Sequence, residues 1–318
     1  MDDTFESFCA DLAESLSERP PEQDTAVVEE VRASLVSPRH SAHCDFAQHR
    51  LRRRIHETTG DCAVRPGQVE TTGDGPFCLP VIRTWQVEVV ERTGSTNADL
   101  MARLRKGDNV TGVALIALEQ EAGRGRLTRS WESPAGESVA VSVGVPMGAD
   151  SEQWGLIPLM AGLAVARAVK DLGGQASLKW PNDVLLSGRK VCGILAESVV
   201  PTAVVGIGVN VGQSEATIGF PQGISLVMAG VDVSRAEVAA ALLARLGEVF
   251  GEDEPRHTLH LKDYKQWCAT IGEPVRVHLD ATTIVEGIAV DVADDGRLVV
   301  SSGGRTTAYS SGDVYHLR

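Results

Sequence analysis

A regular succession of strand-like and helix-like segments begins at Trp85 and limits the possible folds more than any other feature of the sequence. Trp85, Val87 and Val89 alternate with polar residues, as in a half-buried strand. Further strands are expected at residues 113–118, 138–145, 184–186, 190–197 and 203–210, and helices at 97–104, 153–172, 259–267 and from the capping box at 234–237 to about 250. This succession predicts a mixed α and β domain.

The character of the chain changes near residue 80 and again near residue 269. Four of the six cysteines and four of the eight histidines lie before residue 80, together with an arginine-rich run. The last fifty residues contain short strand-like segments at 274–279, 283–291, 298–301 and 305–309, a spacing that suits a small barrel. We therefore expect an N-terminal accessory domain at 1–80, a central domain at 81–268 and a C-terminal barrel at 269–318.

The acidic balance of the chain limits its partners. The 318 residues carry a formal net charge of −13, whereas proteins that coat nucleic acid use Lys and Arg to neutralise phosphates. No apolar run approaches the roughly 20 residues that span a bilayer, and the chain starts with acidic residues where a signal peptide is basic. The cysteines lack the paired short spacings of a disulfide framework. We therefore expect a cytoplasmic protein with reduced thiols and no membrane segment, in which any contact with DNA is local.

A glycine- and arginine-containing segment concentrates positive charge within this acidic chain. Gly123 and Gly125 lie on either side of Arg124, and Arg126 and Arg129 follow. Glycine lets the backbone approach a ligand closely, and an arginine fork binds carboxylate or phosphate oxygens bidentately. The segment therefore indicates an anion-binding loop, and a solvated basic loop is the alternative interpretation.

A second segment combines a cation with groups that suit a nucleotide. Residues 179–183 are Lys, Trp, Pro, Asn and Asp, so an ammonium, an aromatic face and two hydrogen-bonding side chains lie within five positions. Lys190 follows on a strand that leads to Gly193, where the missing side chain would let a flat ligand lie against the backbone. An ordinary turn and a solvated edge lysine are the alternative interpretations of these two features.

Five motifs occur in the order and spacing of biotin protein ligases, and the chain resembles that family from about residue 85 to the C-terminus. The motifs are Gly94-Ser95-Thr96-Asn97 and residues 120–131, 179–183, 189–195 and 206–210. The resemblance implies an α+β fold with a mixed-sheet, class II synthetase-like catalytic domain, a small C-terminal SH3-like β-barrel and an N-terminal mainly helical domain. Lipoate ligases are a related group that lacks this combination of Gly-Arg-Gly-Arg and Lys-Trp-Pro-Asn-Asp, so biotin is the favoured substrate.

The resemblance implies a two-step reaction. Biotin and ATP would form biotinyl-5′-adenylate and pyrophosphate, and the biotinyl group would pass to one lysine of a biotin carboxyl carrier domain. Attack of a carboxylate on the α-phosphate brings two anions together, so fixed cations and Mg²⁺ held through the ATP phosphates would do most of the catalysis. Lys190 and Arg124 are the expected catalytic residues. Family analogy also allows a homodimer formed through the sheet.

By the same resemblance, the motif residues divide between two ligands. The expected biotin-binding residues are Ser95, Thr96, Asn97, Gln120, Gly123, Arg124, Gly125, Arg126, Lys190, Gly193 and Leu195. The expected nucleotide-binding residues are Arg126, Trp131, Lys179, Asn182, Asp183 and Asn210. Within these sets, Gln120 would hold the ureido end of biotin together with residues 95 and 96, and Trp131 would cover the nucleotide.

The chain departs from the family pattern at Leu127 and Thr128, where members often have a basic residue followed by glycine. The departure leaves Arg124 and Arg126 in place. The two properties that it concerns are the mobility of the loop and the time for which the loop retains the adenylate. A polar loop with two glycines is poorly held without a ligand, so we expect it to order on binding an anion. Equal protease cleavage near Arg126 with and without biotin plus ATP would count against this expectation.

Residues 1–80 allow two functions. Helix-like patterns at 5–16, 26–35 and 45–56 and a glycine-rich stretch at 60–75 fit the winged helix-turn-helix with which bifunctional family members bind DNA and repress biotin-synthesis genes. The third helix would be basic through Arg50, Arg52, Arg53 and Arg54. The region also has eight arginines, no lysine and fifteen acidic residues, so a solvent-facing accessory domain is the alternative. A zinc site is disfavoured because no Cys-x-x-Cys accompanies His40, His43, Cys44, His49 and His56.

Overall fold

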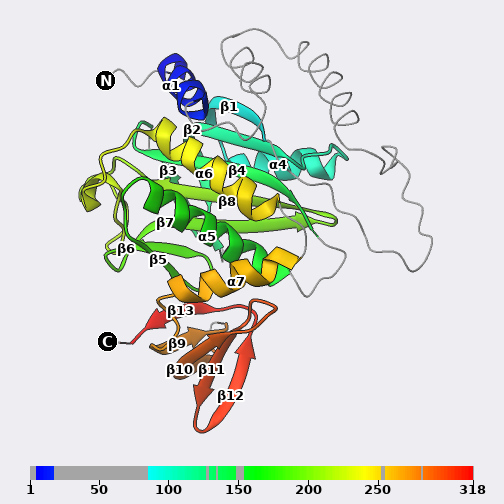
Figure 1. Cartoon of the computed structure of the whole chain (residues 1–318), viewed down its shortest axis with the longest axis vertical. Helices are drawn as coiled ribbons and strands as arrows, with labels where there is room; N and C mark the ends of the chain where they lie inside the picture. Colours follow the sequence, from blue (N-terminus) through cyan, green and yellow to red (C-terminus); the bar gives the residue numbers. More distant parts are fainter. Residues whose placement is uncertain are drawn as a thin grey trace, which may run out of the picture.

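The structure, a computed structural model, is described over one N-terminal helix and over most of the chain from Trp85 onward. The described residues are 5–17, 85–126, 129–133, 135–147, 154–251, 255–280 and 282–317. The expected helices at 26–35 and 45–56, the glycine-rich stretch at 60–75, and Leu127 and Thr128 lie outside them. Figure 1 shows a large body built on a mixed sheet, with a smaller C-terminal sheet at one end.

The mixed sheet has the hydrogen-bonded order β1-β2-β4-β8-β7-β6-β5, and β3 pairs with β2. Its strands are β1 (Gln86–Thr93), β2 (Val113–Arg124), β3 (Ser130–Ser133), β4 (Ser138–Pro146), β5 (Ala176–Lys179), β6 (Asp183–Leu186), β7 (Arg189–Val199) and β8 (Thr202–Asn210). β1 and β2 are parallel, and the other pairs are antiparallel. The α+β class expected from the sequence is confirmed.

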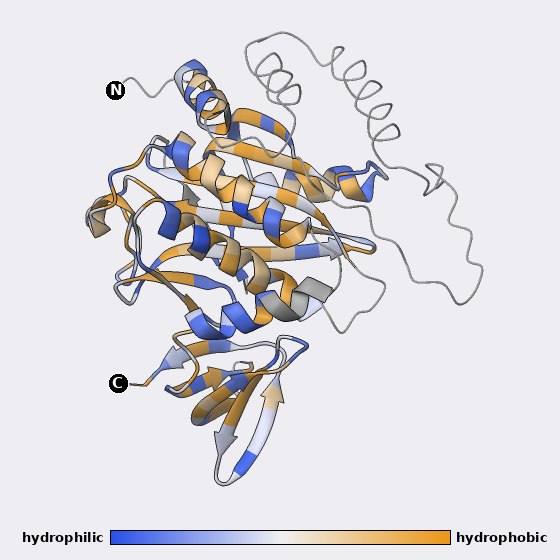
Figure 2. Ribbon diagram, in the orientation of Figure 1, coloured by the Kyte–Doolittle hydropathy of each residue, from blue (hydrophilic) through white to orange (hydrophobic). Residues whose placement is uncertain are grey.

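Helices cover both faces of the sheet, which is why β2 has buried residues pointing both ways. Ala114 and Ile116 join the main core with α5 (Leu156–Asp171) and α6 (Arg235–Phe250), which lie side by side over one face (Figure 1). Val113 and Leu115 join a second cluster with Leu100 and Met101 of α4 (Thr96–Arg105) on the opposite face. The alternation follows from the two-residue period of a strand. Figure 2 shows apolar residues along the strands that these helices cover.

α6 begins at the capping box expected from the sequence. The Ser234 hydroxyl accepts a hydrogen bond from the Glu237 backbone N–H at 3.2 Å, and the Glu237 carboxylate accepts one from the Ser234 backbone N–H at 2.8 Å. The two bonds satisfy N–H groups that have no partner inside the helix. α7 (Pro255–Trp267) follows and leads into the C-terminal sheet.

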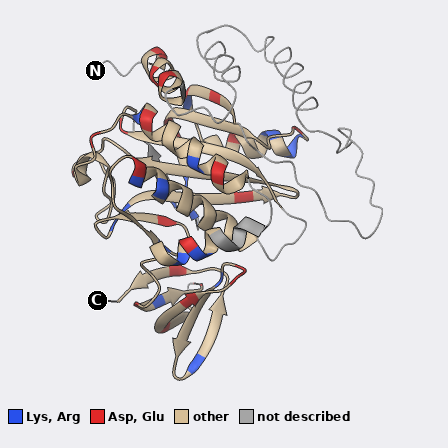
Figure 3. Ribbon diagram, in the orientation of Figure 1, with Lys and Arg blue, Asp and Glu red and all other residues tan. Residues whose placement is uncertain are grey.

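The N-terminal helix α1 (Phe5–Ser17) packs on α6 and belongs to the core of the mixed-sheet body. Its apolar face buries Phe8, Cys9 and Leu12, and Leu12 is fully buried. The guanidinium of Arg235, at the start of α6, lies 5.3 Å from the centre of the Phe8 ring, which is a cation–π distance. The acidic residues of α1 lie on its exposed side (Figure 3). The helix expected at residues 5–16 is therefore confirmed, and it contacts the body directly.

The C-terminal sheet has five antiparallel strands in the order β12-β11-β10-β9-β13. They are β9 (Pro274–His278), β10 (Ile284–Val292), β11 (Leu298–Ser302), β12 (Arg305–Tyr309) and β13 (Asp313–His316). Buried Trp180 links this sheet to the larger body: its indole Nε1 donates to the Gly296 carbonyl at 2.9 Å, and its backbone N–H donates to Thr270 Oγ1 at 3.0 Å. His316 Nε2 lies 3.1 Å from the same Thr270 oxygen.

Three cysteines lie in the described part of the chain, and all three are buried free thiols: Cys9, Cys192 and Cys268. Burial raises the pKa of Cys192 far above its ordinary value, so this thiol stays protonated. None of the described helices combines the length and the apolar character needed to cross a membrane.

Candidate active site

Glycines in neighbouring strands form a flat floor on the face of the sheet that also carries α4. Gly193 of β7 pairs with Gly208 of β8, and Gly206 lies two residues before Gly208 on the same strand. The indole of Trp131 lies on this floor: a Cβ at Gly208 would be 2.2 Å from its Nε1, and a Cβ at Gly193 would be 2.9 Å from its Cζ3. Only glycine lets an aromatic ring approach the backbone this closely. The floor can therefore receive a flat group.

The indole N–H of Trp131 is buried and has no hydrogen-bond partner among the described residues. The side-chain oxygen of Asn97, beside Gly206, is also buried and unpartnered within them. Buried polar groups without partners are uncommon because each costs free energy. A donor and an acceptor left open on the same face are what a polar ligand would satisfy.

One end of the floor carries a network of neutral polar side chains. The Gln120 side-chain oxygen accepts hydrogen bonds from the Thr96 backbone N–H at 2.9 Å and from Thr96 Oγ1 at 3.0 Å. Thr96 Oγ1 also lies 2.8 Å from Ser142 Oγ. Ser95 caps α4, because its hydroxyl accepts from the Ala98 N–H at 3.4 Å. The Ser-Thr-Asn turn thus ends β1, starts α4 and presents hydrogen-bonding groups to the floor.

Arg124 reaches the same face from the end of β2. Its guanidinium forms an ion pair with Glu197 of β7, with 2.6 Å between the guanidinium nitrogen and Oε2. The Asn97 side-chain amide donates to the same Oε2 at 2.5 Å. The cation expected to act on an anion is therefore held by a carboxylate that sequence reasoning did not single out.

The opposite end of the floor carries cations. Lys190 Nζ lies 2.6 Å from Asp183 Oδ1 and 5.6 Å from the centre of the Trp131 ring. Lys179 also interacts with Asp183. Burial lowers the pKa of the Lys179 ammonium, the charge of Asp183 raises it, and the charge of Lys190 lowers it further. Two lysines therefore share one carboxylate, an arrangement that an additional anion would stabilise.

Arg126 lies between the two sheets. Its guanidinium donates to the Asn182 side-chain oxygen at 3.1 Å and to the Gly312 carbonyl at 3.4 Å. Burial lowers the pKa of Arg126, and the charges of Asp313 and Asp183 act in the opposite direction. Arg129 forms an ion pair with Asp313. The C-terminal sheet thus contributes a backbone carbonyl and a carboxylate to the arginine-containing segment.

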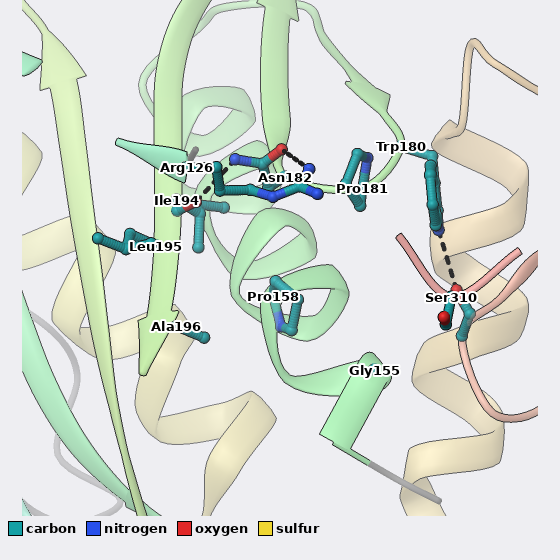
Figure 4. A pocket seen from close by; sticks show the side chains of 11 residues that line it. Arg126, Gly155, Pro158, Trp180, Pro181, Asn182, Ile194, Leu195, Ala196 and Ser310 are labelled. Carbon is teal, nitrogen blue, oxygen red and sulfur yellow. Dashed lines mark hydrogen bonds between the residues drawn. The ribbon is translucent and has the colours of Figure 1, made fainter. Parts of the chain in front are cut away.

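A cavity of about 140 Å³ lies beside β7, and both the mixed sheet and the C-terminal sheet contribute to its walls. Figure 4 shows Arg126 and Asn182 along its rim, Leu195 on β7, and Trp180 beside Ser310. Three residues expected from the sequence in the ligand sites, Arg126, Asn182 and Leu195, therefore line one cavity.

The structure brings most of the expected site residues to one region, and one of them takes a different place. The side chain of Asn210 is buried, and its amide nitrogen donates to the backbone carbonyls of Lys190 at 3.4 Å and Ile224 at 3.2 Å. Its oxygen accepts from Gln213 at 3.2 Å. The amide of Asn210 therefore holds the backbone around Lys190 and does not present itself to the floor.

Three site residues were not identified from the sequence: Glu197, Ser142 and Asp313. A signal for Glu197 was present, since residues 193, 195 and 197 alternate along β7 and point to one face. Ser142 and Asp313 come from strands with no charged or glycine-rich motif, so only the folded chain brings them to the site. The resulting arrangement can hold an elongated molecule with a polar ring at one end and an anionic group at the other.

Comparison with known families accounts for both parts of the molecule. Residues 89–214 match the biotin/lipoate A/B protein ligase family, and residues 270–317 match the biotin protein ligase C-terminal domain. The biotin–[acetyl-CoA-carboxylase] ligase of Mycobacterium tuberculosis is 43% identical over 239 residues, which are 73% of this chain and 90% of that protein. The bifunctional ligase/repressor BirA of Escherichia coli is 29% identical over 72% of this chain and 73% of its own length.

A solved structure gives the same assignment. The biotin protein ligase of Aquifex aeolicus in complex with biotin and ATP superimposes with a TM-score of 0.61 at 27% identity, over 73% of this chain and 98% of that one. Both matched regions of sequence and the described fold thus agree. The chain belongs to the biotin protein ligase family and is an enzyme of the ligase class.

Proposed function

We propose that this protein activates biotin with ATP and transfers it to one lysine of a biotin carboxyl carrier domain, such as that of an acetyl-CoA carboxylase. The observation that carries the proposal is that Arg124 and Lys190 lie on the face of the glycine floor and that Arg126 lines the cavity beside β7, although the three cations come from separate stretches of sequence. An acyl phosphate linkage between two anionic substrates requires such a set of fixed cations.

In the first step, the biotin carboxylate attacks the α-phosphate of ATP, the bond to the β-phosphate breaks, and pyrophosphate leaves. Thr96 and Gln120, with Ser95 and Asn97, would hold the ureido end of biotin, and Gly193 and Leu195 would offer backbone groups. Lys190 and Arg124 would stabilise the charge that builds on the phosphate. Removal of one such donor typically costs about 3–4 kcal/mol of barrier.

In the second step, the carrier lysine amine attacks the acyl carbon of the adenylate, and AMP leaves. Trp131, Arg126, Lys179, Asn182 and Asp183 are the nucleotide side of the site in this proposal. The described residues contain no group of three His, Cys, Asp or Glu side chains that could cage a metal. Mg²⁺ would therefore arrive with the ATP phosphates, as it commonly does in nucleotide sites.

The proposed domain organisation keeps a catalytic domain at 81–268, with a class II synthetase-like sheet, and an SH3-like barrel at 269–318. β6 pairs with β7 only as far as Gly193, and from Leu195 to Val199 β7 pairs only with β8 among the described strands. An open strand edge is where another chain can add its own strand. This edge, next to the cavity, is the proposed place for the carrier domain or for a second copy in a homodimer.

The test is transfer of labelled biotin to an acceptor domain. Wild type should label the acceptor only with ATP present, and Lys190→Ala should lower the rate by 10²-fold or more, roughly the effect of losing one preorganised donor. Lys170→Ala is the matched control, because Lys170 lies over the Trp267 ring, away from the floor. Wild-type rates in Lys190→Ala would contradict the assignment. Thermal stabilisation by lipoate and not by biotin would contradict the substrate.

A further inference from the structure

Asn97 is a buried amide whose nitrogen is hydrogen-bonded and whose oxygen is not. The residue is only 4% exposed. Its side-chain nitrogen donates to Glu197 Oε2 at 2.5 Å, whereas its oxygen has no hydrogen-bond partner among the described residues. A buried acceptor without a donor costs free energy, so such a group is expected where a ligand supplies the donor.

Glu197 determines which end of the Asn97 amide is left open. An asparagine amide carries a donor end and an acceptor end of similar shape, whereas an ionised carboxylate can only accept hydrogen bonds. The NH₂ group must therefore face Glu197, and the amide oxygen must face away from it. Glu197 lies on β7, and the Arg124 guanidinium, 2.6 Å away, pairs with the same Oε2. The carboxylate is thus held from a second side and can fix the orientation of the amide.

The open oxygen of Asn97 lies over the glycine floor. A Cβ at Gly206 would be 2.8 Å from this oxygen and 3.1 Å from the Asn97 Cγ, so the missing side chain leaves room for the amide. The same end of the floor carries Thr96 and Gln120, which are hydrogen-bonded to each other. The cation Lys190 lies at the opposite end. The open acceptor therefore belongs to the end of the site that suits a neutral polar ring.

An acceptor at this position selects a ring that carries an N–H group. The ureido ring of biotin has N–H groups beside its carbonyl, whereas the dithiolane ring of lipoate has none. A site built to bond an N–H discriminates strongly against a ligand without one, because its buried acceptor is then left unpaired. If the Asn97 amide were turned over, its NH₂ group would meet the ring N–H, and two donors would face each other. The orientation of this amide therefore bears directly on recognition.

We propose that Glu197 is a positioning residue for substrate specificity, which orients the Asn97 amide so that its oxygen accepts a hydrogen bond from a ureido N–H of biotin. The inference rests on the proposed function, since that function supplies biotin as the ligand. Glu197 acts through Asn97 and touches neither biotin nor the reacting atoms. Its loss should lower both the affinity for biotin and the preference for an unmodified ureido ring.

The first test is a double-mutant cycle between Glu197 and Asn97, with the Kd for biotin measured by titration calorimetry. Glu197→Met keeps the length of the side chain and removes the acceptor. It should raise the Kd about tenfold, as expected when one buried hydrogen bond is no longer oriented. In the Asn97→Ala background, the same substitution should change the Kd less than about twofold. An equal loss in both backgrounds would mean that Glu197 acts through Arg124 instead, and it overturns the inference.

The second test uses biotin methylated on one or the other ureido nitrogen, because a general weakening of the site would affect methylated and unmethylated biotin alike. Wild type should prefer biotin over at least one of these isomers, and that preference should fall about fivefold or more in Asn97→Ala and in Glu197→Met. The same preference in wild type and both variants overturns the inference.

Glu119→Gln is the matched control, because Glu119 also pairs with an arginine, Arg92, on the same sheet, with 2.9 Å between the charged atoms. It should keep the wild-type Kd and the wild-type preference. Thermal melts report whether each variant folds, and Glu197→Leu replaces Glu197→Met if the latter does not. An unchanged Kd in a folded Glu197 variant also overturns the inference. Absence of biotin binding by wild type would instead overturn the proposed function.

Discussion

Gly208→Ala should weaken ATP binding much more than it weakens the fold. A Cβ at this position would lie 2.2 Å from Nε1 and 2.3 Å from Cε2 of Trp131, whereas ordinary contacts begin at 3.4 Å, so the indole must move by about 1 Å. Forcing a methyl group into a packed site costs roughly 1–3 kcal/mol. Since 1.4 kcal/mol is a factor of ten in a binding constant, we expect the Kd for ATP to rise roughly 5- to 150-fold.

Titration calorimetry with ATP measures this Kd, and a thermal melt reports on the fold. The Tm should change little, because the Trp131 side chain is only partly buried and can swing toward solvent. Gly212→Ala is the matched control: the position follows β8, and a Cβ there would lie 3.8 Å from the nearest heavy atom. A wild-type Kd for Gly208→Ala would refute the reasoning, because the floor beneath Trp131 would then not be part of the nucleotide site.

Three further predictions concern the fold and its dependence on pH. Leu12→Ala should lower the free energy of unfolding by roughly 2–5 kcal/mol in urea titrations, because this side chain of α1 is fully buried. Trp180→Phe should cost about 1–3 kcal/mol by the same measurement, because it leaves the Gly296 carbonyl without its 2.9 Å donor. Burial, and secondly the charge of Lys179, lower the pKa of His316 below its ordinary value of 6.5. The unfolded chain therefore binds the proton more tightly, so unfolding free energy should fall as pH drops below about 6.5, and less so in His316→Asn. A Leu12→Ala or Trp180→Phe variant as stable as wild type, or an unchanged pH dependence in His316→Asn, would contradict the respective argument.

Periodicity located most elements of the larger sheet because their burial follows a simple rule. The helix expected at 153–172 is α5, most of whose residues are buried, and the strand expected at 203–210 is β8. Shorter strands were missed where the pattern is too brief to show a period. β3, β5 and β13 have four residues each, and neighbouring strands decide their pairing.

Candidate site residues could be predicted where the informative groups are close together in the sequence. They could not be predicted where two side chains far apart in the sequence meet across the sheet. Arg124 and Lys190 were identifiable because glycines and other polar groups accompany them in sequence. The partner of Arg124 was not, because Glu197 is 73 residues away and meets it only across the face of the sheet. Asn210 is the opposite case, because its place in a matching motif predicts a contact with the nucleotide. In the structure its side-chain amide donates to two backbone carbonyls, and only the packing around the residue reveals this.

The placement of α1 bears on the DNA-binding hypothesis for residues 1–80. In a three-helix DNA-binding domain, the apolar face of the first helix packs against the other two, yet here Phe8 and Leu12 pack against α6. One face cannot do both. Full exposure of these two side chains would cost about 3–6 kcal/mol, at roughly 1.5–3 kcal/mol each. A DNA-binding unit that used α1 would have to recover that free energy elsewhere. If DNA binding occurs, it should therefore survive deletion of residues 1–17, and a biotin-promoter mobility shift that required them would show that α1 leaves α6.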